Sequence, residues 1–192
     1  MNSDFDSRTL ENTWPQKAIL AEHERALHKD EYHALARARW LAYLRQPGRK
    51  LYKGALEDAL DSRRRCCLGH ACAMLMEHAM FYPELTLERK FSGGNPGSCV
   101  VYISRDDRPD LLSWCLESSR LPQAVAILLD ITESGIFAKP IRIGGAQYWE
   151  LMSVNDQVPG MTAEWISYII EEQIIDNNLL PHPANTDGRT AS

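Results

Sequence analysis

Apolar residues recur at helical spacing along most of this chain, and this pattern predicts a mainly helical fold. Over residues 15–44 an apolar residue returns every seven positions, which gives one helical face. The residues on that face are Leu20, Leu27, Ala34 and Leu41. Pro47-Gly48 ends the pattern, because proline disfavours helix continuation and glycine accepts a left-handed turn. The polar stretch at 28–31 leaves open whether this segment is one helix or two.

Helical patterns also occur further along the chain. The most apolar helix is expected over residues 66–81. Further helices are expected after the polar turn at 106–110, after Leu121-Pro122, over residues 147–154 and over residues 162–176. Thr162 suits the N-cap of the last helix. Apolar positions on these helices, including most of the tryptophans, are expected to form the core.

Strand patterns are few. Residues 98–104 are rich in β-branched and aromatic side chains and predict the best strand. A weaker strand is expected over residues 140–143, before Gly144-Gly145, and residues 91–96 are typical of a loop. We therefore predict a mainly α (α+β) fold, a compact single helical domain with a small two- or three-stranded β element.

The ends of the chain lack these patterns. Residues 1–14 are polar and predict a disordered arm, and residues 177–192 predict a disordered tail. Residues 15–176 are then expected to form a single globular domain, with an N-terminal helical segment over 15–45 and a core over 46–176. The full length of 192 residues is enough to bury a core of this kind.

Charge and hydropathy exclude some classes of function. The net charge of −5 argues against direct nucleic-acid binding, which normally uses a basic face. No apolar run approaches the roughly 20 residues that cross a membrane, and the acidic N-terminus does not resemble a signal peptide. We expect a cytoplasmic protein without membrane contact. Its five cysteines are then expected to be reduced thiols.

Three of the five cysteines lie within the sequence Cys-Cys-Leu-Gly-His-Ala-Cys at residues 66–72, here called the cysteine motif. It follows three consecutive cations, Arg63, Arg64 and Arg65, here called the arginine run. Cations and a helix N-terminus lower the pKa of a thiol. One hypothesis is therefore a cysteine-dependent hydrolase or transferase with Cys66 or Cys67 as the nucleophile.

Such an enzyme needs a histidine base oriented by a further polar group. The candidates for the base are His70 and His78 on the same helix, and His23, His28 and His33 from the first segment. Asn155 or Asp156 would be the orienting group. The spacing in the sequence does not show that these side chains meet.

The cysteine motif also permits a zinc-stabilised interaction module. Cys67, His70 and Cys72 would be ligands, with Cys66, Cys99 or Cys115 as the fourth. Structural zinc sites generally use two separated pairs of ligands. Here the ligands share one helix, on which residue 72 points away from residues 67 and 70. The alternative for each cysteine is a buried thiol in the core.

A third hypothesis for this region is a binding site for an anion. Guanidinium groups and the free N–H groups of a helix N-terminus suit phosphate or carboxylate. The alternative is a solvated charged loop. Asn155-Asp156 would extend the binding surface, or would simply form a turn through hydrogen bonds from side chain to backbone.

The order of motifs along the chain resembles a widespread group of small phage and prophage proteins. The N-terminal half has Trp40-x3-Leu44, then Tyr52-x-Gly54-x-Leu56, then the cysteine motif. The C-terminal half has Leu121-Pro122-x-x-Val125, Leu151-x3-Asn155-Asp156 and Trp165-Ile166. The chain departs from the group at Arg65, where an aromatic residue is usual, and at His70, where a small aliphatic residue is usual.

The resemblance implies a phage or mobile-element origin and supplies no activity. By analogy with small phage proteins, we expect an accessory protein that inhibits or sequesters a component of a host defence or regulatory system, in the host cell cytoplasm. Its partner would be a host protein or a small anionic, nucleotide-like ligand, without a cofactor, and homo-oligomers remain possible. The residues expected to bind are Arg63, Arg64, Arg65, Cys67, Asn155 and Asp156.

Overall fold

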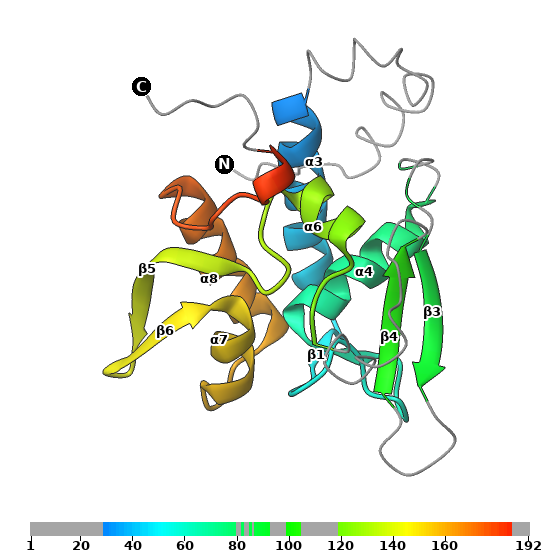
Figure 1. The fold of residues 1–192 in the computed structure, drawn as a ribbon. Coiled ribbons are helices and arrows are strands. Elements are labelled where there is room, and N and C mark those ends of the chain that lie inside the picture. Colours follow the sequence, from blue (N-terminus) through cyan, green and yellow to red (C-terminus); the bar gives the residue numbers. More distant parts are fainter. Residues whose placement is uncertain are drawn as a thin grey trace, which may run out of the picture.

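Helices dominate the structure, a computed structural model that describes residues 29–79, 82, 85, 87–92, 99–104 and 119–185. The helices are α3 (Lys29–Leu44), α4 (Cys67–Glu77), α6 (Gln123–Leu129), α7 (Leu151–Gln157) and α8 (Ala163–Ile175), followed by the 3-10 helix η2 (Pro183–Asn185). The strands are β1 (Lys50–Leu51), β2 (Arg64–Arg65), β3 (Leu87–Ser92), β4 (Cys99–Ser104), β5 (Ile136–Ile143) and β6 (Ala146–Glu150). The prediction of a mainly α (α+β) fold is confirmed (Figure 1).

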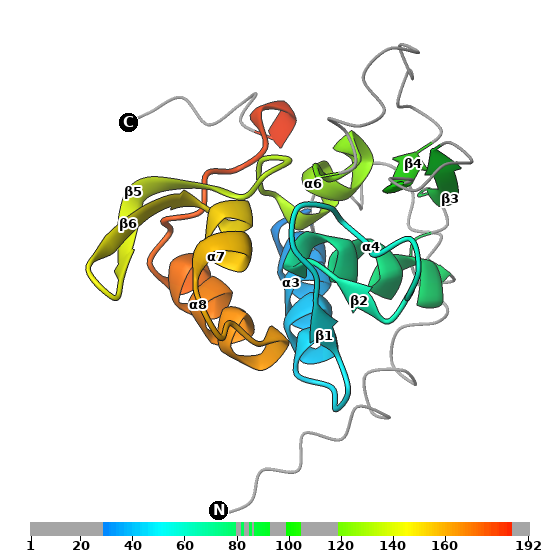
Figure 2. The same cartoon turned by 90° about the horizontal axis from the view of Figure 1, so that it is seen from below.

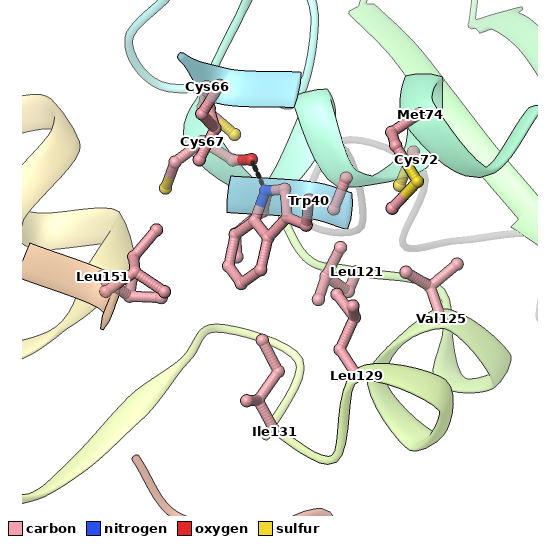
Figure 3. Packing of buried hydrophobic residues seen from close by; sticks show 14 of the residues in the cluster. Trp40, Cys66, Cys67, Cys72, Met74, Leu121, Val125, Leu129, Ile131 and Leu151 are labelled. Carbon is pink, nitrogen blue, oxygen red and sulfur yellow. Dashed lines mark hydrogen bonds between the residues drawn. The ribbon is translucent and has the colours of Figure 1, made fainter. Parts of the chain in front are cut away.

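Helix α3 lies at the centre of the helices and contacts α4, α6 and α8 (Figures 1 and 2). Its Trp40 is completely buried, and the indole Nε1–H donates a hydrogen bond of 2.9 Å to the carbonyl of Cys67 on α4 (Figure 3). Leu121, Leu129 and Leu151 from three other segments lie in the same apolar cluster. A buried indole with its polar atom satisfied fixes how α3 and α4 pack.

Helix α4 is buried along nearly its whole length. Every residue from Cys67 to Leu75 is buried. A helix that is apolar on all sides belongs in a core, which explains why the cysteine motif is enclosed. The helix ends at Glu77, four residues before the predicted end at residue 81.

The described residues form three two-stranded sheets. The predicted strand over 98–104 is present as β4, which pairs antiparallel with β3. Strand β3 takes in residues 91 and 92, which we predicted as loop. The predicted strand over 140–143 is the second half of β5, which pairs antiparallel with β6.

The predicted helix over residues 147–154 is wrong in its first half. Residues 146–150 form β6, and α7 begins only at Leu151. Gly144 and Gly145 adopt φ angles of 58° and 86°, which close a tight turn. The turn folds the following residues back onto β5, with Tyr148 buried and Trp149 exposed in alternation.

The packed part of the chain extends past the boundary predicted at residue 176. Leu179 is buried and forms a bridge with Phe137 of β5. His182 is also buried, and Asn185 donates a hydrogen bond of 2.9 Å to the carbonyl of Ile127. Apolar contact and backbone pairing therefore hold this segment against α6 and β5.

Several predicted segments lie outside the described residues. These are the arm over 1–14, the helical pattern over 15–28, the part of the predicted loop over 93–96, the turn and helix after residue 105, and residues 186–192. In the part of the chain that is described, no helix has the length and apolar content needed to cross a membrane.

Candidate functional site

Each arginine of the arginine run is paired with an acidic residue that precedes it. The Nε of Arg63 lies 3.1 Å from a carboxylate oxygen of Asp61. Arg64 contacts Asp58 at 2.9 Å, and the guanidinium of Arg64 also lies over the ring of Tyr52. The three cations are therefore balanced locally, by carboxylates that lie within eight residues of them in the sequence.

Arg65 points into the protein and pairs with the buried carboxylate of Glu57, with 2.8 Å between Nε and Oε2. The Glu57 side chain is fully buried and also accepts hydrogen bonds from Arg89 and the hydroxyl of Tyr102. Burial alone would raise the pKa of Glu57, but the hydrogen bonds from Arg89, Tyr102 and Arg65 together lower it. Arg65 thus belongs to an internal charge cluster between the 57–65 loop and the β3–β4 sheet.

The N-terminus of α4 is closed by protein groups. The backbone N–H of Cys67 donates to Oδ1 of Asn155 at 3.2 Å, and the N–H of Gly69 donates to the Cys66 sulfur at 3.3 Å. The backbone of Leu56 covers Gly69 so closely that an added Cβ would lie 1.8 Å from the Leu56 carbonyl oxygen. The helix start therefore has two of its donors occupied and no room for an anion beside Gly69.

We expected Cys67, Asn155 and Asp156 to share one binding surface, and the structure brings Asn155 to the backbone of Cys67. Asn155 is itself buried, and its Nδ2 donates to the carbonyl of Tyr52 at 2.7 Å. Asp156 accepts a hydrogen bond of 3.0 Å from the N–H of Gly54. Asn155 lies in helix α7 and not in a turn, and the pair holds α7 against the 52–54 loop and the start of α4.

The thiols of Cys66, Cys67 and Cys72 are fully buried. Burial raises the pKa of Cys66 to about 12 and the pKa of the other two well above the usual range. A nucleophilic cysteine needs the opposite shift, toward the thiolate. Burial also lowers the pKa of His70 to about 4, and its Nε2 donates to the carbonyl of Lys50 at 3.1 Å.

The other histidine candidates are placed away from these thiols or are not described. The Nδ1 of His33 donates to the carbonyl of Leu128 on α6 at 2.7 Å. His78 is the C-cap of α4, at the end opposite to Cys66. His23 and His28 lie outside the described residues.

No group of three or more histidine, cysteine or acidic side chains among the described residues is arranged to hold a metal ion. Within the cysteine motif, Cys72 lies apart from Cys66 and Cys67 (Figure 3). The structure does not describe Cys115 or the side chain of Cys99. The geometry of the motif therefore favours core packing of its thiols.

A cavity of about 450 Å³ lies between α3, α6 and the end of α8. The polar side chains in its wall take part in the packing of α6. His33 holds the Leu128 carbonyl, and Arg37 donates to the Leu129 carbonyl at 3.2 Å. Asp130, in a left-handed conformation at the C-cap, accepts a hydrogen bond of 2.9 Å from Asn185. These contacts tie three polar residues of the wall to α6 and to the segment that ends at Asn185.

Helix α8 has a surface that the sequence analysis missed. Trp165, Tyr168 and Ile175 are 68%, 52% and 72% exposed, and they lie on one side of the helix, here called the outer face of α8. The opposite side, including Ile166 and Ile170, is buried. The signal in the sequence was the width of the apolar pattern, because one core-facing stripe cannot accommodate apolar residues all round a helix.

Carboxylates surround this outer face. Helix α8 contains Glu164, Glu171 and Glu172, no lysine or arginine, and Asp176 as its C-cap. Arg45, from the end of α3, donates to Glu171 at 2.6 Å and lies 4.6 Å from the centre of the Tyr168 ring. The surface is thus apolar at its centre and acidic around it.

The outer face of α8 carries three of the five large apolar side chains that are more than half exposed among the described residues. The other two are Leu60 and Trp149. No family model, no curated protein and no solved structure matches this chain. The function is therefore inferred from the geometry of its own residues.

Proposed function

We propose that this chain is a phage-type accessory protein that binds a protein component of a host defence or regulatory system and so inhibits or sequesters it. The host cell cytoplasm would be the place where it acts. The observation that carries the proposal is the outer face of α8. The contact surface would be centred on Trp165 and Tyr168.

Exposed aromatic residues support protein binding for an energetic reason. Each large aromatic side chain buries roughly 150–250 Å² when it is covered, and tryptophan and tyrosine are enriched among the residues that dominate binding energy. Trp165 and Tyr168 are three residues apart, so one partner surface can cover both. A hydrophobic centre with a polar rim is also the common anatomy of interfaces.

A nucleotide-like ligand has less support than a protein partner. It would require free guanidinium groups and an open helix N-terminus. The arginine run is paired with Asp61, Asp58 and Glu57, and Asn155 occupies the N–H of Cys67. The raised pKa values of the thiols likewise give a cysteine-dependent enzyme no support.

Co-purification tests the contact surface. Tagged full-length protein would be produced in phage-infected host cells as wild type, as the double variant Trp165→Ala/Tyr168→Ala, and as Trp149→Ala, which removes an exposed tryptophan from β6. We expect a partner that wild type and Trp149→Ala recover in equal amounts and the double variant loses. Equal recovery by all three folded proteins would refute the assignment of the surface.

Infection assays test the biological role. The protein would be expressed in cells that carry individual defence systems, and plaques of a sensitive phage would be counted. We expect wild type to restore plaque formation against at least one system, and the double variant not to do so. No restoration across the panel, by wild-type protein that is shown to be folded and expressed, would count against an anti-defence function.

A further inference from the structure

The outer face of α8 has a chemistry that specifies its partner further. We infer that the partner presents a basic surface, with arginine or lysine side chains around an apolar centre. This inference rests on the proposed function, because it concerns the same contact surface. It is carried by the acidic side chains around Trp165, Tyr168 and Ile175.

Carboxylates and apolar side chains alternate on this side of the helix. Glu164 precedes Tyr168 by four residues, and the Tyr168 hydroxyl donates to its carboxylate at 3.4 Å. Glu172 follows Tyr168 by four residues and precedes Ile175 by three. It therefore lies between these two side chains on the helix surface. A partner that covers the apolar centre therefore also covers the carboxylates.

Arg45 shows how a cation binds on this surface. Its guanidinium lies 4.6 Å from the centre of the Tyr168 ring, and it donates to Glu171 at 2.6 Å and to Ser167 at 2.9 Å. A planar cation on an aromatic face, held by a carboxylate, is the arrangement that arginine favours. The chain thus already binds one guanidinium at Tyr168, on the side of Glu171.

On the other side of Tyr168, the carboxylates of Glu172 and Asp176 have no cation corresponding to Arg45 among the described residues. Glu172 and Asp176 make no ion pair with any side chain in the described part of the chain. Trp165 precedes Glu172 by two helical turns and lies on the same side. A partner's arginine or lysine placed there would repeat the contacts of Arg45, with Glu172 as the carboxylate.

The same charges disfavour other occupants. A second copy of this chain would bring acidic rims together, and like charges across an interface cost free energy. Anionic lipid and nucleic acid would meet the same repulsion. A basic protein surface is the occupant that complements both the apolar centre and the rim.

A pair of synthetic peptides tests the charge preference on the full-length protein. Both would be amphipathic 18-residue helices with the same leucine face, one with arginine and one with glutamate on the polar face. The readout is the indole N–H signal of Trp165 in an NMR titration, assigned with Trp165→Phe. We expect the arginine peptide to bind at least about tenfold more tightly, with an affinity that falls as salt rises. Equal affinity for both peptides would overturn the inference.

Charge reversal separates this inference from the proposed function. Glu172→Arg/Asp176→Arg would be compared with Glu88→Arg, which reverses an exposed carboxylate on β3. We expect the double reversal to abolish the preference for the arginine peptide and to prevent co-purification of the partner, and the β3 variant to do neither. If Trp165→Ala/Tyr168→Ala prevents co-purification and charge reversal does not, the basic partner is wrong and the proposed function stands. If neither double variant has an effect, the basic partner and the proposed function are both wrong. If the wild-type protein is a dimer that dissociates in Trp165→Ala/Tyr168→Ala, the occupant of the surface is a second copy of this chain and the basic partner is wrong.

Discussion

The carboxamide oxygen of Asn155 accepts a hydrogen bond from the backbone N–H of Cys67, 3.2 Å away and 88 residues earlier in the chain. The same side chain donates to the carbonyl of Tyr52 at 2.7 Å. One buried carboxamide thus joins three segments: the start of α4, the 52–54 loop and α7. The Asn-Asp pair and the cysteine motif are therefore parts of one structural contact.

Replacing Asn155 with alanine is expected to destabilise the protein by about 1–3 kcal/mol, because the N–H of Cys67 and the carbonyl of Tyr52 would lose their buried partner. Urea denaturation measures the free energy of unfolding. Asn155→Asp keeps the acceptor and loses the donor, so it should also be destabilising. Ser153→Ala, which removes a hydroxyl on the same helix, should change stability by less than about 0.5 kcal/mol. An Asn155→Ala protein as stable as this control would contradict the structural role.

The sequence predicted this meeting of segments in part. The expected binding surface included Cys67, Asn155 and Asp156, and the helical pattern located α4, α6 and α8. The sequence could not show that Asn155 is buried, because the N–H group that Asn155 binds belongs to Cys67, which is distant in the sequence. The arginine run was interpreted as a binding surface without weighing the acids at positions 57, 58 and 61, which lie within eight residues of it.

Errors in the fold have similar causes. Strand β3 is formed by the charged sequence Leu-Glu-Arg-Lys-Phe-Ser, which has no strand pattern of its own and is stabilised by pairing with β4. The register places Arg89 opposite Tyr102, and both side chains hydrogen-bond to Glu57. Local patterns locate helices well, whereas pairing partners and buried charges depend on the tertiary structure.

Gly69→Ala is expected to be strongly destabilising, by more than about 3 kcal/mol. The new Cβ would lie 1.8 Å from the carbonyl oxygen of Leu56, so the backbone of one segment must move. The same carbonyl accepts the N–H of Cys66 at 3.0 Å, and that bond would be lost with the movement. Thermal unfolding measures the change, with Met76→Ala at a more exposed position of α4 as the control. A small shift in Tm for Gly69→Ala, similar to the control, would show that the contact is looser than described.

The thiols of Cys66, Cys67 and Cys72 are expected to resist iodoacetamide at neutral pH in the folded protein. Their burial excludes the reagent, and the raised pKa keeps each sulfur protonated. Peptide mass spectrometry after a short treatment identifies which cysteines are modified, and the same treatment in denaturant should modify all three. Rapid labelling of Cys66 or Cys67 in the native protein would instead support the hypothesis of a cysteine-dependent enzyme.

His70→Leu is expected to make stability less dependent on pH between about 6.5 and 4. Burial lowers the pKa of His70 to about 4 in the folded protein, whereas the unfolded chain has a value near 6.5. The unfolded state therefore binds more protons in this range, and wild-type stability falls as pH falls, by about 3 kcal/mol from this group. Urea titrations at several pH values measure the slope, with His78→Leu as the comparison. Parallel pH profiles for wild type and His70→Leu would mean that the pKa of His70 is the same in the folded and unfolded states.

Glu57→Gln is expected to cost about 3–5 kcal/mol, because it removes the buried carboxylate that pairs with both Arg65 and Arg89 and accepts the hydrogen bond of Tyr102. The folded-state pKa of Glu57 is lowered, so its stabilisation is present above the unfolded value of about 4.3 and is lost as pH falls through the folded value. The difference in unfolding free energy between wild type and Glu57→Gln should therefore narrow at acidic pH, below the range in which His70 titrates. Glu88→Gln, an exposed carboxylate paired with Lys90, is the control and should have little effect on stability at pH 7. A constant difference between wild type and Glu57→Gln down to pH 2 would show that Glu57 stabilises the fold by packing and not by charge.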